Sequence, residues 1–256
     1  MKLAVFSDVH SNLEALELFI EHSSRHGVDE FACLGDIIGY GPNPNECIAT
    51  VSSLVNIDIV MGNHEWAILN PLEASLTMNP MAHDAIVWTQ QQLSEQSRKY
   101  ISGLQYKIRK GPFTFVHASA FEPDRWEYLL AGNSAGVALC LLHSASRMTF
   151  VGHTHRPMIA DSHGESLIPA ASFKDGTTFR YSGSDKILVN PGSIGQPRGG
   201  FRKPYYITVD TESNEITWHR LDDYDPERTV EKILATSLPQ ECAYYLNRLS
   251  LSIRQQ

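Results

Sequence analysis

Five short apolar segments of this chain each lead directly into polar residues that could bind a metal ion or a phosphate group. The clearest is VMGNHEWAI at residues 60–68, where an apolar segment ends at Gly62 and an amide, an imidazole and a carboxylate follow. The polar residues after the five segments are Asp8, His10, Asp36, Asn63, His64, His117, His153 and His155. Ligands of open parallel sheets bind outside the carboxyl ends of the strands, so we expect these side chains to meet at one edge.

The first 61 residues alternate between strand and helix patterns. The predicted strands are compact apolar segments at residues 2–6, 31–34 and 55–61. The helix between the first two strands begins with the capping-box pair Ser11 and Glu14, and the next helix begins with Asn43 and Pro44. This βαβαβ order predicts a parallel sheet with helices on its faces.

The pattern changes after the third strand. Residues 66–103 are mostly helical in periodicity, with breaks at Pro71 and Pro80, and we expect a cap-like insertion over the strand ends. A last helix is predicted after Asp225. No segment has the composition of a linker, so residues 1–256 are predicted to form a single domain. The later predicted strands cover residues 113–117, 149–152, 186–190 and 205–209.

The composition limits the classes of function. A formal net charge of −8 gives no general basic surface for long nucleic acid or for an anionic membrane. The four cysteines show no pairing motif and are expected to be reduced. No apolar segment approaches the ~20 residues that span a bilayer, and the N-terminus has no signal-peptide pattern. These features favour a cytoplasmic protein with no membrane partner.

So many polar groups at one edge of a sheet would be electrostatically unfavourable without cations. Two divalent metal ions would resolve this, because a carboxylate can bridge them and imidazoles can complete each ligand set. Mixed oxygen and imidazole ligands suit Mn²⁺, Fe or Zn²⁺ and argue against a pure Ca²⁺ site. Two such ions ~3.5–4 Å apart can activate a water for phosphoryl transfer. In this interpretation Asn63 is a metal ligand and His64 is a proton donor.

Five motifs carry a family resemblance: DVH at residues 8–10, GD at 35–36, GNHE at 62–65, His117, and GHTH at 152–155. In this order they resemble the calcineurin-like metallophosphoesterase superfamily. The stretches GDIIGYGPNPNECI, HASAFEPDRWEYLL and NPGSIGQPRGG resemble its small bacterial phosphodiesterase-type branch. The resemblance implies an α/β fold, a four-layer α/β/β/α sandwich of two mixed sheets flanked by helices, with residues 66–103 as a helical cap-like insertion.

The resemblance also implies roles for individual residues. The implied ligands are Asp8, His10 and His155 for one divalent ion, Asn63, His117 and His153 for the other, and Asp36 as the bridge. His64 is the implied general acid, a role that typically contributes ~10²–10⁴-fold to the rate. The implied nucleophile is a metal-bridging hydroxide. Mn²⁺ is the expected ion, with Fe, Zn²⁺ and Ni²⁺ as alternatives.

The chain departs from some relatives at the second motif. Protein phosphatases and symmetrical dinucleoside tetraphosphate hydrolases carry Gly-Asp-x-Val-Asp-Arg-Gly there, whereas this chain has Gly39 and Tyr40 in place of the second Asp and the Arg. A protein phosphatase is therefore not expected. The group that orients His64 stays open, with Glu65 as one candidate. Tyr40 and Arg198 are predicted to contact the substrate.

Other residues with functional chemistry are expected to have ordinary structural roles. Arg125 and Arg202 lie in loops that could face a phosphate, but they are expected at the surface. Trp66 and Trp88 are expected in the core, with stacking on a nucleobase as the alternative. Helix surfaces and loops are the expected places for the six remaining histidines, which are His22, His26, His83, His143, His163 and His219.

The sequence therefore predicts a dinuclear metal-dependent hydrolase of a small phosphodiester or a nucleotide phosphoanhydride. A dinucleoside polyphosphate hydrolase or a nucleotidase is the alternative within the enzyme class. A protein-interaction scaffold or a nucleotide sensor of the same fold is the alternative from another class. The expected partner is a small phosphorylated substrate, and the oligomeric state stays open.

Overall fold

The computed structural model describes residues 1–130 and 132–251, with side chains up to residue 247. Its first sheet has the order β3-β2-β1-β10-β11-β8. The strands β1, β2 and β3 run parallel, and each later neighbour in the sheet is antiparallel. The predicted parallel βαβαβ start is therefore confirmed. The strand bounds are β3 Ile57–Ile59, β2 Glu30–Cys33, β1 Lys2–Phe6, β10 Tyr205–Asp210, β11 Glu215–Arg220 and β8 Thr177–Arg180.

The second sheet has the order β4-β5-β6-β9-β7. Its three central strands are parallel, and both edge strands are antiparallel. Both sheets are thus mixed, as predicted. The strand bounds are β4 Lys107–Lys110, β5 Phe113–Val116, β6 Met148–Phe150, β9 Ile187–Asn190 and β7 Met158–Ala160.

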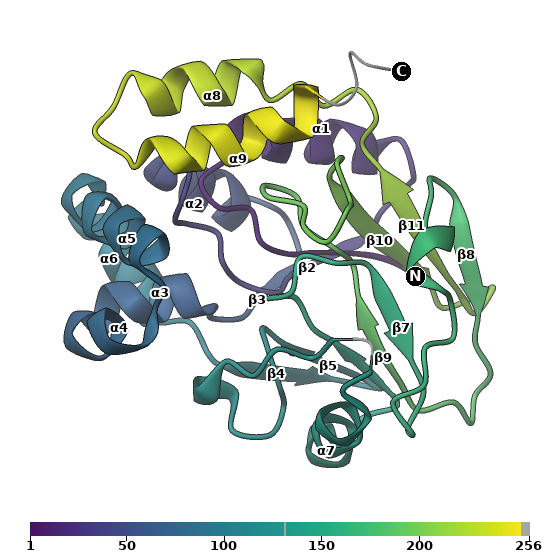
Figure 1. Cartoon of the computed structure of the whole chain (residues 1–256). Coiled ribbons are helices and arrows are strands. Elements are labelled where there is room, and N and C mark those ends of the chain that lie inside the picture. Colours follow the sequence, from purple (N-terminus) through teal and green to yellow (C-terminus); the bar gives the residue numbers. More distant parts are fainter. Residues whose placement is uncertain (131, 252–256) are drawn as a thin grey trace.

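Strand β1 shows why the molecule has four layers. Its residues alternate between faces, so Leu3 and Val5 pack into an apolar core shared with the second sheet, while Ala4 and Phe6 pack against helices. The helices on that outer face are α1 (Leu13–Ser24) and α2 (Pro44–Ser52). Helix α7 (Ser134–Ser144) covers the outer face of the second sheet (Figure 1). The predicted α/β/β/α sandwich is confirmed.

The stretch predicted as a helical insertion consists of four helices at one side of the molecule (Figure 1). Proline occupies the first turn of two of them, α4 and α5, where its missing N–H costs nothing. Helix α5 contributes Trp88 to an apolar cluster that also contains Ile233 and Leu246 of the two C-terminal helices. The bounds are α3 Asn63–Leu69, α4 Pro71–Thr77, α5 Pro80–Gln92, α6 Glu95–Ser102, α8 Glu227–Leu234 and α9 Gln240–Leu251.

The start of α1 differs from the predicted capping box. The side chain of Asn12, not that of Ser11, accepts the cap hydrogen bond, from the N–H of Ala15 at 3.2 Å. Ser11 instead has a left-handed backbone, with φ 53°. Glu14 binds Lys232 of α8 at 2.6 Å. The predicted cap failed because Glu14 serves a contact with a distant part of the chain.

The sequence patterns missed several elements. Three of the four missed strands have only three or four residues, which leaves little room for alternation. Within the described residues, no helix is both long enough and apolar enough to cross a membrane. The missed elements are β4, β7, β8, β11, α7, α9 and the short 3₁₀ segments η1 (Pro123–Arg125) and η2 (Ala170–Ser172).

Candidate metal centre

The loops after five strands meet at one edge of the two sheets. Backbone hydrogen bonds join them: the N–H of His10 donates to the carbonyl of Asp36 at 2.9 Å, and that of Gly152 donates to His117 at 2.8 Å. Five of the predicted metal ligands in these loops have a left-handed backbone, with φ between 49° and 61°. Such conformations cost of order 1–3 kcal/mol each and cluster at functional sites. The five are Asp8, His10, Asp36, His153 and His155.

A first group of possible metal ligands consists of Asp8, His10, Asp36 and His155, all buried. One ligand atom from each lies within 4.8 Å of those of the others. Nε2 of His155 is 3.3 Å from Oδ1 of Asp8 and 3.1 Å from Nε2 of His10. Nε2 of His10 is 3.7 Å from Oδ2 of Asp36. Two carboxylates and two imidazoles therefore surround one small volume.

A second group consists of Asp36, His117 and His153. Nε2 of His117 lies 3.3 Å from Oδ2 of Asp36 and 3.2 Å from Nδ1 of His153. The side-chain oxygen of Asn63 lies 3.1 Å from the same Nε2. The structure thus brings all the residues predicted as ligands into two adjoining groups, and Asp36 belongs to both.

Backbone carbonyl oxygens fix the tautomers of three of these histidines. A carbonyl oxygen only accepts, so Nδ1 of each ring carries a proton and Nε2 is the nitrogen left to bind a metal ion. Burial lowers the pKa of both His10 and His155 well below the usual value, so neither ring gains a second proton at neutral pH. Their Nε2 lone pairs face each other at 3.1 Å, an arrangement that a cation stabilises. The pairs are His10 with Ile38 (3.1 Å), His117 with Leu34 (2.7 Å) and His155 with Gln196 (2.5 Å).

Two of the predicted ligands, Asp8 and His153, have donor atoms that lack hydrogen-bond partners within the described residues. Burial raises the pKa of Asp8 to about 7, and neither carboxylate oxygen has a hydrogen-bond partner within the described residues. Burial lowers the pKa of His153 to about 3, and Nε2 of that ring also lacks a partner within them. Burial alone would raise the pKa of Asp36, but its interactions with the rings of His117 and His64 outweigh this effect and lower that pKa well below the usual range. These buried, unpaired donors fit a divalent metal ion.

Glu65 organises the loop that carries Asp36. Its carboxylate is fully buried and accepts four backbone N–H groups at 2.8–3.2 Å. Burial raises the pKa of Glu65 to about 7, and the N–H donors act in the opposite direction. The donors are Asp36, Ile37, Ile38 and Gly62. No hydrogen bond links its side chain to the imidazole of His64, so Glu65 shapes the loop and does not orient that ring directly.

Ring packing holds His64 in place. The ring centroids of His10 and Tyr40 each lie 4.7 Å from that of His64. Its backbone N–H donates to Oδ1 of Asp36 at 2.9 Å, and its Nε2 lies 3.9 Å from Oδ2 of the same carboxylate. Gly39 lies directly against Nδ1 of His64, so a Cβ at position 39 would overlap the ring. The side chain is therefore oriented by two aromatic neighbours and a glycine.

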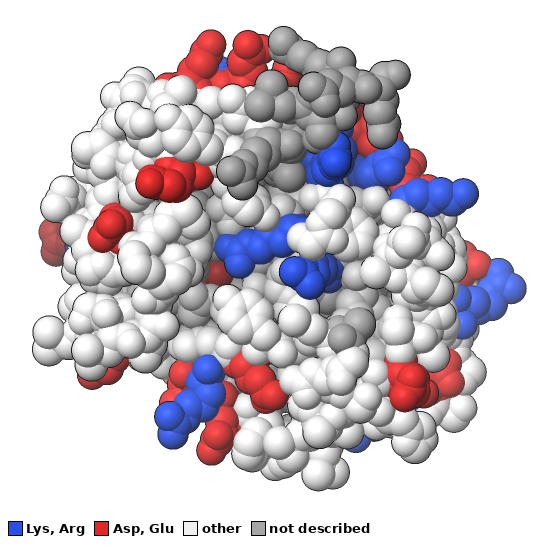
Figure 2. All heavy atoms as spheres, viewed as in Figure 1, with Lys and Arg blue, Asp and Glu red and all other residues white. Residues whose placement is uncertain are grey.

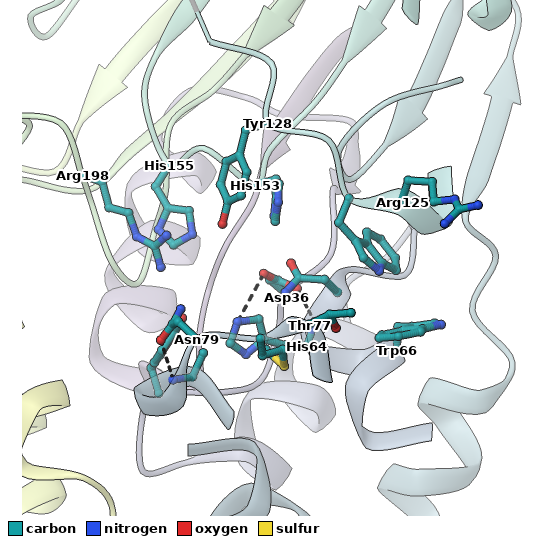
Figure 3. A pocket seen from close by; sticks show the side chains of 15 residues that line it. Asp36, His64, Trp66, Thr77, Asn79, Arg125, Tyr128, His153, His155 and Arg198 are labelled. Atoms are coloured by element: carbon teal, nitrogen blue, oxygen red, sulfur yellow. Dashed lines mark hydrogen bonds and ion pairs between the residues drawn. The ribbon is translucent and has the colours of Figure 1, made fainter. Parts of the chain in front are cut away.

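A cavity of about 190 Å³ opens over these groups. Tyr40 and Arg198, the two residues predicted to contact a substrate, both line it. The guanidinium carbon of Arg198 lies 5.7 Å from the Tyr40 ring centroid, and its Nη2 donates to Oε1 of Gln196 at 2.6 Å. Figure 3 shows Arg198 beside His155 at the cavity wall, and Figure 2 shows basic side chains bordering a hollow at the centre of this face.

Two other arginines are exposed, as expected, and one aromatic residue at the cavity was not expected. Arg125 lines the cavity, but it is exposed and its guanidinium points away from Asp36 in Figure 3. Arg202 lines a separate hollow with Arg220. Tyr128, which the sequence reasoning did not single out, stacks on His153 with ring centroids 4.0 Å apart. Its position in an irregular loop left no periodic signal that could have indicated this contact.

The model of the calcineurin-like phosphoesterase superfamily domain matches residues 1–214. The chain belongs to this superfamily. It is 34% identical over 243 residues to an uncharacterised protein of Methanocaldococcus jannaschii, covering 93% of this chain and 94% of that protein. The crystal structure of a metallophosphoesterase from Sphaerobacter thermophilus is similar with a TM-score of 0.83 and 33% identity, over 96% of this chain and 98% of the other. A hypothetical protein from Pyrococcus horikoshii shares the fold at 19% identity, with a TM-score of 0.79 over 96% and 97% of the two chains.

Membership gives the two ligand groups a chemical meaning. The superfamily consists of metal-dependent enzymes that hydrolyse phosphoesters, and this phosphoesterase has buried Asp and His groups that could hold metal ions. The donor set is mixed, with carboxylate oxygens and imidazole nitrogens. That combination favours a transition metal ion over Ca²⁺ or Mg²⁺.

Proposed function

We propose that this phosphoesterase is a dinuclear hydrolase that cleaves a small phosphodiester, with His64 as the general acid. The observation that carries the proposal is the pair of ligand groups that share the buried carboxylate of Asp36. His64 donates its backbone N–H to the same carboxylate and lines the cavity above it. A substrate phosphorus atom over the two groups would therefore lie next to an imidazole.

The residues divide between two ions in this proposal. Divalent ions, with Mn²⁺ as the proposed native one, would supply Lewis-acid polarisation of the phosphoryl oxygens and would lower the pKa of an attacking water. The protein orients the ligands through the three backbone carbonyls that fix the histidine tautomers. One ligand set is Asp8, His10, Asp36 and His155, and the other is Asp36, Asn63, His117 and His153.

His64 would protonate the leaving oxygen. Burial lowers its pKa to about 4, and the positive charge of Arg198 acts in the same direction. The imidazole of the free enzyme is therefore neutral at pH 7. An anionic phosphoryl group in the cavity would raise this pKa, so substrate binding itself would favour the protonated, acidic form.

The cavity favours a small substrate with a negatively charged phosphoryl group. Arg198 is the half-buried cation at its wall, placed to bind a phosphoryl oxygen. Helices α3 to α5 of the proposed insertion also contribute to the wall, through Trp66, Thr77 and Ala82. We propose that this helical region and the sandwich form one domain that encloses the substrate.

Aromatic rings favour a second candidate, hydrolysis of a dinucleoside polyphosphate. Trp66 and Trp126 both line the cavity, with ring centroids 6.0 Å apart. The ring centroid of Tyr106 lies 5.9 Å from that of Trp126. A nucleobase stacked on such a surface gains ~1–3 kcal/mol. This supports the alternative that the sequence left open for Trp66.

The test compares hydrolysis of an aryl phosphodiester, the matching monoester and a dinucleoside tetraphosphate by metal-stripped protein refilled with Mn²⁺. We expect diester turnover that requires the metal and falls ~10²–10⁴-fold in His64→Ala, with the bound metal retained. His163→Ala is the matched control, because His163 is exposed and lies outside both ligand groups.

The possible results separate the proposals. Preferred cleavage of the dinucleoside tetraphosphate would select the second candidate. Two bound metal ions without turnover of any substrate would refute the hydrolase proposal in favour of a nucleotide sensor or a scaffold. Failure to bind metal would refute the ligand assignment itself.

A further inference from the structure

We propose that His22, His26 and His219 form an additional binding site for a transition metal ion, separate from the reaction centre. The three rings come from two elements far apart in the sequence. His22 lies in the last turn of α1, His26 lies in the turn that follows this helix, and His219 lies in β11. This corrects the expectation that all three histidines lie in loops or on helix surfaces, because His219 is buried in the first sheet.

The geometry brings one nitrogen of each ring into a common volume. These three nitrogens all lie within 4.8 Å of one another. The ring centroids of His26 and His219 are 4.3 Å apart, and those of His22 and His26 are 4.9 Å apart. Three nitrogens that bind one Zn²⁺ at ~2.0–2.1 Å lie closer to one another than the 4.8 Å limit within which these three lie. Binding therefore needs a small rotation of a side chain.

Hydroxyl groups hold two of the rings in a ligand-like orientation. Nδ1 of His22 forms a hydrogen bond with the Tyr206 hydroxyl at 2.8 Å, which leaves Nε2 unused. Nε2 of His219 forms one with the Thr208 hydroxyl at 2.8 Å, which leaves Nδ1 unused. Metal-binding histidines commonly use the second ring nitrogen in this way, since that contact fixes the tautomer.

His26 supplies the adjustable part of the site. No hydrogen bond engages its ring within residues 1–130 and 132–251, and the residue is half-buried. Its position just beyond the end of α1 lets the ring rotate toward the other two. The site thus consists of two ligands held by hydrogen bonds and a third, His26, whose ring can rotate to bind the ion.

The electrostatics favour neutral imidazoles, the form that binds metals. Burial lowers the pKa of His219 to about 3, and burial followed by the charge of His22 lowers that of His26. Two charged side chains also act on the cluster: Lys2 lowers the pKa of both rings and Asp175 raises it. The rings of His26 and His219 are therefore held in the unprotonated form that binds a metal ion.

Three imidazoles with a partly exposed fourth position suit Zn²⁺, Cu²⁺ or Ni²⁺ better than the oxygen-preferring Mn²⁺ or Mg²⁺. A bound ion would connect the end of α1 to β11, which lie in adjoining layers (Figure 1). Because the ion binds only when these elements are packed together, it would stabilise the folded state. The site does not depend on the hydrolase proposal, since it shares no residue with either group around Asp36.

The experiment measures Zn²⁺ stoichiometry and affinity by calorimetry on the metal-stripped full chain, together with the change in Tm on adding Zn²⁺. We expect His26→Ala to bind one equivalent fewer than the wild type and to lose the corresponding part of the Tm increase. Thr208→Val keeps all three ligands but removes one orienting hydroxyl, so it should retain the stoichiometry with affinity for one site weaker by about 10–100-fold. His163→Ala controls for loss of an exposed histidine.

Two results would overturn the proposal. Equal Zn²⁺ stoichiometry in the wild type and His26→Ala would exclude a site at this cluster. An equivalent lost in His163→Ala as well would show nonspecific surface binding. If His26→Ala failed to fold, the affinity change in Thr208→Val would decide, and its absence would count against the site.

Discussion

Replacing Gly39 by alanine would place a methyl group where the ring of His64 now lies. The added Cβ would overlap Nδ1 of His64 and would stand 2.9 Å from Cε1 and 3.0 Å from Cγ. The ring cannot easily move aside, because His10 and Tyr40 pack on it with centroids 4.7 Å away. We therefore expect Gly39→Ala to displace the proposed general acid without touching any proposed metal ligand.

The size of the effect follows from two separate costs. Gly39 has φ +91°, a conformation that strains alanine by of order 1–3 kcal/mol and lowers stability. Displacing a general acid lowers kcat by ~10²–10⁴-fold, which corresponds to about 2.7–5.5 kcal/mol of activation free energy. Only the second cost changes turnover of the folded enzyme. The expected kcat of Gly39→Ala is therefore close to that of His64→Ala.

The assay is hydrolysis of the aryl phosphodiester with Mn²⁺, with metal content and unfolding measured on the same samples. Gly200→Ala is the matched control, because Gly200 has φ +92° and no heavy atom lies within 4 Å of its added Cβ. Gly200→Ala should lower the stability through backbone strain and leave turnover of the diester unchanged. The double variant Gly39→Ala/His64→Ala should be no slower than His64→Ala alone, because both changes remove the same interaction.

Wild-type turnover in Gly39→Ala would refute this reasoning, since the overlap with His64 would then have no catalytic consequence. A double variant much slower than either single variant would show that Gly39 acts through some other group. Loss of bound metal in Gly39→Ala alone would mean that the loop carrying Asp36 had moved, and the assignment of the effect to His64 would be wrong.

Three further predictions concern the support of the site and the fold. Glu65→Ala strands four buried N–H donors and should lower the free energy of unfolding by about 4 kcal/mol or more in denaturant titration. Arg198→Ala should raise KM for the diester by about 10–100-fold, whereas Arg202→Ala, outside the cavity, should not. Burial acts to raise the pKa of Glu14, but its hydrogen bond from Lys232 contributes to a net lowering. The stabilisation from Glu14 is therefore present above its unfolded-state pKa and disappears as pH falls through the folded value, so the stability difference between wild type and Glu14→Gln should shrink between pH 7 and pH 3.

The sequence could predict which residues gather at the site because ligand chemistry depends on residue type and on position along a strand. Asp8, Asp36 and His117 each follow an apolar strand, and parallel strands place their carboxyl ends at one edge. The layer order came from the family resemblance. Periodicity alone indicates no more than one parallel sheet. It contains no information on how a second sheet packs against the first.

The arrangement within the site could not be predicted, because it depends on contacts between distant residues. The left-handed backbone of Asp36 and the four N–H groups that Glu65 accepts arise only when two strand-end loops meet. Spacing likewise indicated Ser11 as the cap of α1, but its backbone N–H donates to Ile37 in the second loop. Asn12 takes the cap in its place. Local rules failed where tertiary contacts determined the backbone.

The absence of a carboxylate at Nδ1 of His64 has a chemical consequence. Nδ1 of this ring has no hydrogen-bond partner within the described part of the chain, and Gly39 fills the space next to it. A second carboxylate at Nδ1 would add to the effect of Asp36 and raise the pKa of the imidazole, whereas burial here lowers it to about 4. The protonated ring is therefore a stronger acid than it would be beside a carboxylate, and it would form mainly when an anionic phosphate is bound. Such an acid can protonate a strongly basic leaving group, such as the alkoxide of a ribose phosphodiester, as well as the less basic phenolate of an aryl diester.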